Sequence, residues 1–102
     1  MTPEILRYRI AAERQADFLA AYTVAGESLR ASPHCLGYEL LQSAKDAELY
    51  LLTIHWDSPE GHLQGFRRSA EFARFLEQVK PYIGDLLEME HYAATDLHWR
   101  RA

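Results

Sequence analysis

Apolar and polar side chains alternate with a period of two along residues 4–11, and three further short segments of the chain are rich in apolar side chains. This alternation is typical of β-strands, because successive side chains of a strand point to opposite faces of its sheet. We expect strands at residues 4–11, 35–43, 48–56 and 86–94. A short polar turn, Lys45-Asp46-Ala47, separates the second segment from the third, which predicts that these two strands pair as an antiparallel hairpin.

Residues 13–31 instead repeat apolar side chains at helical spacing. We expect an amphipathic helix that ends before Ser32-Pro33, because proline disfavours a helical conformation in the residue that precedes it. The apolar stripe of this helix comprises Phe18, Tyr22, Ala25 and Leu29.

A second helical region follows the third strand segment. Ser58-Pro59 is a typical helix start, and Ser69 offers another cap eleven residues later. Residues 59–68 and 70–80 are therefore expected to form two helical segments with a bend between them. The buried stripe of the later segment comprises Phe72, Phe75, Leu76 and Val79.

The predicted order β-α-β-β-α-β is that of the ferredoxin-like α+β fold, with an antiparallel sheet and both helices on one face. The chain of 102 residues has the usual length of one domain and contains no linker or repeat. We expect a single domain over residues 1–102, with a core at about 4–93 and a polar tail at 94–102.

Several of the predicted strands are apolar on both faces. In the third, Tyr50, Leu52, Ile54 and Trp56 lie opposite Leu49, Leu51, Thr53 and His55. The second is expected to place Leu36, Tyr38 and Leu40 opposite Leu41, and the last to place Leu87 and Met89 opposite Leu86 and Tyr92. Two helices cover only one face, so a second copy of the sheet is the simplest cover for the other. The pattern predicts a homodimer.

Charge and composition narrow the possible partners. The net charge is −4 and the basic residues form no run longer than a pair, which argues against nucleic acid. No signal-peptide region or stretch of about 20 apolar residues occurs, so we expect no membrane partner. The single cysteine, Cys35, has no partner for an internal disulfide. A cytoplasmic protein is expected.

At this point the residues resemble a known family, the antibiotic biosynthesis monooxygenase (ABM) domains. The resemblance covers about residues 4–93 and is carried by Gly37-Tyr38-Glu39-Leu40, Trp56 with Ser58, His62, Ser69 with Phe72, and Glu90-His91-Tyr92. It implies a dimeric α+β barrel. It also implies a monooxygenase that oxidises phenolic, quinol-like or polyketide-like molecules with O2 and without metal or flavin.

One subgroup of that family degrades haem, and the sequence departs from it. The subgroup binds haem through a histidine on the second long helix, a position that falls near Phe75 here. It also uses an asparagine, and this chain contains none. These departures argue against haem degradation.

The candidate site lies where the third strand meets the following helix. His62 and Phe66 are four residues apart and share a helix face, and Trp56 ends the adjoining strand. We expect His62 and Trp56 as catalytic residues. The expected substrate-binding residues are Tyr38, Phe66, Tyr22 and Phe72. The alternative is a packing corner in which His62 bonds a backbone carbonyl and the rings fill the core.

Metal and cofactor motifs are missing from the sequence. No His-x-x-x-His or His-Glu-x-x-His spacing occurs, and His55, His62 and His91 can converge only through the fold. We therefore expect no cofactor and no metal. Two other functions remain open for the same pocket: a non-catalytic module that binds a small ligand, and an isomerase or cyclase that uses acid/base chemistry without oxygen.

Overall fold

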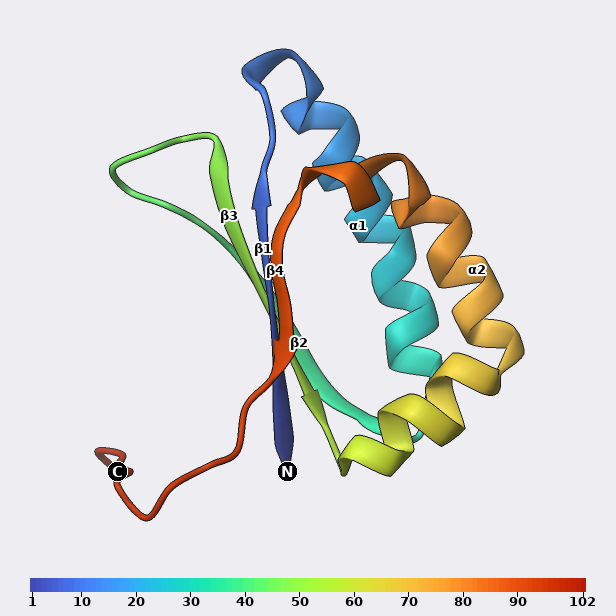
Figure 1. The fold of residues 1–102 in the computed structure, drawn as a ribbon, viewed down its shortest axis with the longest axis vertical. Helices are drawn as coiled ribbons and strands as arrows, with labels where there is room; N and C mark the ends of the chain where they lie inside the picture. Colours follow the sequence, from blue (N-terminus) through green and yellow to red (C-terminus); the bar gives the residue numbers. More distant parts are fainter.

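The computed structural model describes all residues, 1–102. A four-stranded antiparallel sheet carries both main helices on one face, as Figure 1 shows. The strands are β1 (Thr2–Arg9), β2 (Cys35–Gln42), β3 (Leu49–Trp56) and β4 (Leu86–His91), and the helices are α1 (Gln15–Ala31) and α2 (Ala70–Val79). This arrangement confirms the predicted α+β ferredoxin-like fold, with element ends that differ from expectation by up to three residues.

The strands lie in the order β2-β3-β1-β4, so β1 and β3 occupy the centre of the sheet. Both central strands alternate buried and more exposed residues, as period-two patterning requires. The inward side chains pack under the helices in one apolar core. The largest fully buried members are Trp56, Phe18, Phe66, Ile10, Leu29, Leu52 and Ile54.

Two irregularities in strand pairing correct the predicted faces of β2 and β4. Between Cys35 and Gly37 the register shifts against β3, and Leu36 is the residue left without a partner. Leu36 is 59% exposed, whereas Tyr38 packs against the core, so Leu36 lies outside the core that it was expected to share with Tyr38. A bulge inserts one residue and reverses the alternation that follows.

A similar shift in the β1–β4 pairing corrects the last strand. Tyr8 pairs with Leu86 but Arg7 pairs with Glu88, so Leu87 is extra. Met89 then pairs with Leu6 and faces the helices, while Leu87 lies on the opposite face beside Leu41. Leu87 and Met89 were expected on one face, and the bulge separates them.

The segment between β3 and α2 is the least regular part of the fold. Ser58 caps it by accepting a hydrogen bond from the Gly61 N–H at 2.9 Å. Gly61–Gly65 then forms a π-helix (η2), and Phe66–Arg68 forms a short 3-10 helix (η3). Ser69 breaks the helix and caps α2 by accepting from the Phe72 N–H at 3.2 Å. The predicted pair of helical segments with a bend is confirmed, although the π-helix was not foreseen.

The C-terminal tail leaves the sheet after β4 and extends away from the body of the molecule (Figure 1). No helix of the fold has the length and apolar character needed to cross a membrane.

Candidate active site

The π-helix points His62 into the interior, between the sheet and the helices. Its wide turn is shown by the Phe66 N–H, which bonds the carbonyls of both Gly61 and His62. The ring of His34 lies against Gly65, and its Nδ1 pairs with the Asp57 carboxylate at 2.9 Å. Single π-helical turns are rare and concentrate at functional sites, so this turn is a local sign that His62 has a task beyond packing.

Trp56 ends β3 directly beneath this turn. Its indole is fully buried and stacks on the His62 ring, with centroids 4.4 Å apart and planes 7° from parallel. The indole N–H donates to Glu4 Oε1 at 3.0 Å. A single tryptophan therefore orients both an imidazole and a carboxylate.

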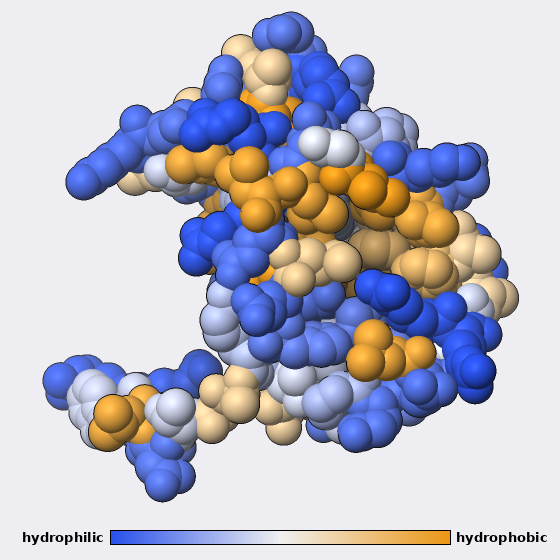
Figure 2. Space-filling view, viewed as in Figure 1, coloured by the Kyte–Doolittle hydropathy of each residue, from blue (hydrophilic) through white to orange (hydrophobic).

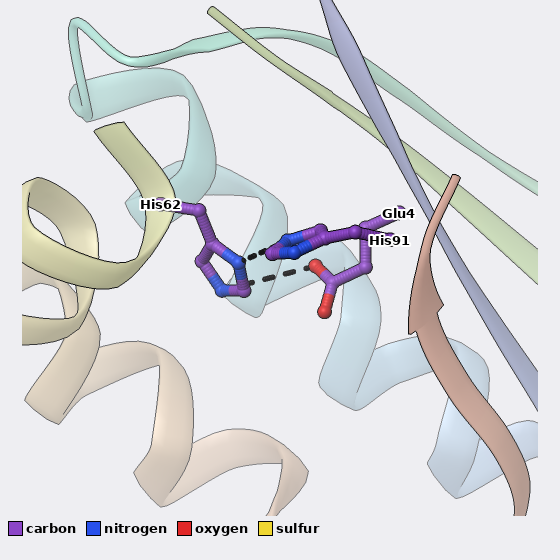
Figure 3. Close-up of side chains that lie close together, drawn as sticks. All are labelled: Glu4, His62 and His91. Atoms are coloured by element: carbon purple, nitrogen blue, oxygen red, sulfur yellow. Dashed lines mark hydrogen bonds and ion pairs between the residues drawn. The ribbon is translucent and has the colours of Figure 1, made fainter. Parts of the chain in front are cut away.

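Glu4, His62 and His91 meet at this point (Figure 3). His62 Nδ1 lies 2.7 Å from His91 Nε2, and His62 Nε2 lies 3.8 Å from Glu4 Oε1. Glu4 and His91 are register partners on β1 and β4, so the sheet itself sets their spacing. Their ligand atoms all lie within 4.8 Å of one another, which makes these three residues the group in the chain that could hold a metal ion.

The surroundings set the charge of this cluster. Burial lowers the pKa of His62 to about 4, and electrostatic interactions with His91 and Arg67 act in the same direction. Burial also raises the pKa of Glu4, against the opposing effect of its bond from Trp56. At neutral pH His62 is therefore a neutral imidazole with a nitrogen lone pair available, which is the form a general base requires.

A cavity of about 240 Å³ opens beside Glu4 and His62. Of its 16 lining residues, 13 are hydrophobic. The lining residues come from all the strands except β2, from α1 and α2, and from the segments that connect β3 to α2 and α2 to β4. Figure 2 shows apolar side chains gathered on this face of the molecule, between the sheet and α2. An apolar cavity with a few convergent polar groups is the usual form of a small-molecule site.

Two tyrosines supply a second polar element of the cavity wall. The hydroxyls of Tyr8 and Tyr22 hydrogen-bond to each other, and both side chains are buried. Burial raises the pKa of Tyr8 to about 12 and raises that of Tyr22 further. Both phenols thus stay protonated. One hydroxyl donates within the pair, and the other can donate its hydrogen to an oxygen atom of a bound molecule.

Tyr8 and Glu4 lie four residues apart on β1 with inward-facing side chains. At about 3.3 Å per residue, the two positions are roughly 13 Å apart along the strand. The cavity thus offers an acid/base cluster and a hydroxyl pair separated by apolar walls, a spacing that suits an elongated, mostly apolar molecule with polar groups.

Comparison with known proteins identifies the family to which this chain belongs. Residues 1–78 match the family model described as antibiotic biosynthesis monooxygenase. The chain belongs to the ABM family. No curated protein matches the sequence significantly.

Solved structures agree with the ABM fold. A crystal structure of a Bordetella bronchiseptica protein named for this family has a TM-score of 0.79 and 24% identity, covering 92% of this chain and 96% of that one. A Deinococcus radiodurans protein named for the same family has a TM-score of 0.77 and 18% sequence identity over the full length of both chains. A Mycobacterium tuberculosis protein has a TM-score of 0.74 and 20% sequence identity, and the match covers 93% of this chain and 95% of that one. At these identities the likeness shows the shared fold alone.

In this ABM protein the structure brings five of the six predicted site residues to one cavity. The cavity wall includes His62, Trp56, Phe66, Tyr22 and Phe72. Tyr38 lies elsewhere: its hydroxyl accepts a hydrogen bond from Arg30 and faces Gly26, where a Cβ would collide with it. Tyr38 belongs to a separate shallow groove along α1, so its position does not support the predicted contact with a ligand of the main cavity.

Four residues of this ABM site were not among the predicted ones: Glu4, Tyr8, Arg67 and His91. Glu4 is 4% exposed. The sequence did contain a signal for it, because Glu4 lies two residues before Leu6 and therefore on the predicted inward face of the first strand, where an acidic residue is unusual. His91 belongs to the Glu90-His91-Tyr92 motif that carried the family resemblance. Their convergence depends on the pairing of β1 with β4, which alternation alone does not reveal.

Proposed function

We propose that this ABM protein is a cofactor-independent monooxygenase that oxidises a small aromatic, quinol-like or polyketide-like molecule with O2. The observation that carries the proposal is the buried, neutral His62 at the polar end of an otherwise apolar cavity. Cofactor-free oxygenation needs a base, donors for a developing oxyanion and dry walls. The lining residues supply all three kinds of group.

In this proposal His62 accepts the proton of a phenol or an activated C–H group, and the resulting anion is the electron source for O2. For an activated CH2 carbon, O2 adds at carbon and water leaves, which converts CH2 and O2 into C=O and H2O. The carbon is oxidised by the same number of electrons that reduces O2, so no external reductant enters. His91, 2.7 Å from His62 Nδ1, can share the accepted proton.

Other lining groups stabilise the anion. The guanidinium of Arg67 belongs to the cavity wall and also lies over the Phe72 ring, with its central carbon 5.9 Å from the ring centroid. A positive charge there favours a substrate anion over its neutral form. The Tyr8–Tyr22 hydroxyl pair provides one free O–H donor for an oxygen at the other end of the substrate.

The test is oxygen uptake by metal-stripped, flavin-free protein over a panel of hydroquinones, naphthalenediols and anthrones. We expect uptake above the spontaneous rate, with an oxygenated product identified by mass spectrometry. His62→Phe keeps an aromatic ring against Trp56 but removes both nitrogens, and it should lower the rate by about 100-fold or more, the usual scale for a lost general base.

His98→Phe is the matched control, because it makes the same exchange in the exposed tail and should leave the rate unchanged. Equal rates in His62→Phe and the unsubstituted protein would remove His62 from the mechanism. Conversion of a panel compound without oxygen consumption would identify an isomerase or cyclase, and saturable binding without conversion would identify a binding module.

We also propose that the protein functions as a homodimer formed by the outer face of the sheet. Both helices lie on the other face (Figure 1). The uncovered face exposes large apolar side chains, among them Leu41 (48%) and Leu87 (59%). Leu41, Leu49, Leu51 and Leu87 also line a groove there. Contiguous apolar surface of this kind on a small domain supports association of two copies.

A further inference from the structure

The cluster of Glu4, His62 and His91 has the composition of a transition-metal site. It contains two imidazoles and one carboxylate, the nitrogen and oxygen donors that Zn²⁺ and related divalent ions bind. The three donors come from β1, from the π-helix and from β4 (Figure 3). Their ligand atoms lie within 4.8 Å of one another without any rearrangement.

The two imidazole nitrogens need only a small adjustment to accept an ion, whereas the Glu4 carboxylate, whose ligand atom lies within 4.8 Å of theirs, must move closer. Two Zn–N bonds of about 2.0–2.1 Å at a tetrahedral angle place the nitrogens about 3.3 Å apart. His62 Nδ1 and His91 Nε2 are now 2.7 Å apart. Two imidazole nitrogens at that distance share one proton, and an ion that replaces the proton requires them to separate by roughly half an ångström.

Neighbouring groups already hold the donors in position. The Trp56 indole donates to Glu4 Oε1 at 3.0 Å, which leaves the other carboxylate oxygen free. The same indole stacks on His62 and limits the tilt of its ring. The β1–β4 register fixes Glu4 opposite His91. Partners of this kind, which orient ligands without touching the metal, are the usual second layer of protein metal sites.

The charge balance also favours a cation. Glu4 is 4% exposed, and its one hydrogen bond comes from a neutral indole. The guanidinium of Arg67 forms no ion pair with it, and His62 Nε2 stays 3.8 Å from Glu4 Oε1. A buried carboxylate without a close cation is unfavourable, so a divalent ion at this place would supply the missing countercharge.

We propose that Glu4, His62 and His91 bind one divalent transition-metal ion, with Zn²⁺ as the best fit, and that its remaining coordination position faces the cavity. Glu4 and His62 belong to the cavity wall, so an ion held between them is accessible to a small molecule. The same His62 lone pair cannot serve an ion and a proton at once. Zn²⁺ should therefore inhibit the oxidation proposed above, although the binding itself does not depend on that function.

The test is a titration of metal-stripped protein with Zn²⁺ in the absence of any substrate, by calorimetry and by competition with a chromophoric chelator. We expect one ion per chain and a rise in melting temperature on binding, because the ion binds the folded state. Co²⁺ in place of Zn²⁺ should give the visible absorption of a low-symmetry nitrogen–oxygen site.

Substitution of any one donor should weaken Zn²⁺ binding by about 100-fold or more. His91→Phe and Glu4→Gln are the preferred variants, because His91 is only partly buried and glutamine retains an oxygen acceptor for the Trp56 indole. Each variant is checked for folding by circular dichroism. His62→Phe completes the set.

His34→Ala is the matched control, since His34 and Asp57 form an exposed histidine–carboxylate pair that can also attract Zn²⁺. Unchanged stoichiometry and affinity in this variant, with loss in His91→Phe and Glu4→Gln, establishes the site. Loss in His34→Ala alone, or equal affinity in all variants, overturns it. Absence of oxygen uptake would leave this result untouched, and a failed titration would leave the oxidation proposal untouched.

Discussion

At the scale of single residues, His62 shows how burial changes the chemistry of a side chain. An imidazole in water has a pKa near 6.5, where half of the molecules are charged. Here the stacked Trp56 ring and the surrounding core remove water from His62, and a positive charge on it is further disfavoured by electrostatic interaction with the side chains of His91 and Arg67. The result is a nitrogen base that stays neutral far into the acidic range.

We therefore expect His62 to titrate near pH 4 in metal-free protein. The measurement is an NMR titration of the imidazole C–H signals in the presence of a chelator, with His62→Phe for assignment. The unfolded chain takes up this proton near pH 6.5 and the folded chain only near pH 4. This group therefore lowers the free energy of unfolding as pH falls through that window. A His62 midpoint near 6.5 would contradict the buried, neutral site.

At the scale of elements, the regular parts of the chain followed their sequence patterns and the irregular parts did not. Helix α1 and strand β3 match expectation because their packing agrees with their local periodicity. The bulges at Leu36 and Leu87 and the π-helix at Gly61–Gly65 each change the residue count of one turn or one ladder. Such an extra residue disrupts the local hydrogen bonds, so it depends on tertiary packing and does not follow from the local sequence pattern.

The junction between η3 and α2 gives an element-level prediction. Ser69 Oγ accepts from the Phe72 N–H and donates to the Phe66 carbonyl at 2.6 Å, so one hydroxyl holds both sides of the bend. Ser69→Ala should lower the free energy of unfolding by about 1 kcal/mol. Urea denaturation measures the change. Thr23→Ala, which removes a hydroxyl from exposed α1 bonded only to the Leu19 carbonyl, should be close to neutral. If Ser69→Ala lowered the free energy of unfolding no more than Thr23→Ala does, the Ser69 cap would make no specific contribution to stability.

At the scale of the whole molecule, the fold leaves one broad surface without a cover. The helices lie on one side of the sheet (Figure 1). The cavity and the aromatic core are on that side, and Leu41, Leu49, Leu51 and Leu87 are on the other. The bulge in β4 strengthens this division, because it turns Leu87 outward from the face that it was expected to share with the inward Met89. A domain of this size gains stability by burying such a face against a second copy.

Leu87→Asp is expected to convert a dimer into a monomer, because association would bury the new carboxylate without a partner. Sedimentation at micromolar concentration measures the change. Leu63→Asp is the matched control, since Leu63 is also exposed (44%) but lies on the π-helix. A monomeric unsubstituted protein, or a Leu87→Asp variant that remains dimeric, would disprove an interface on this face.

The sequence by itself determined the element order, the inward face of β3 and the ring-rich corner of Trp56, His62 and Phe66. All of these are local: a period of two or of about four residues, and caps at Ser58 and Ser69, are decided by neighbours along the chain. Only the tertiary structure decided that Glu4 and His91 join His62, and that Tyr38 stays outside the cavity. These facts depend on which strands pair and in what register. Residues 87 positions apart in the chain, Glu4 and His91, become neighbours through that pairing, and the two bulges then set which side chains reach the site.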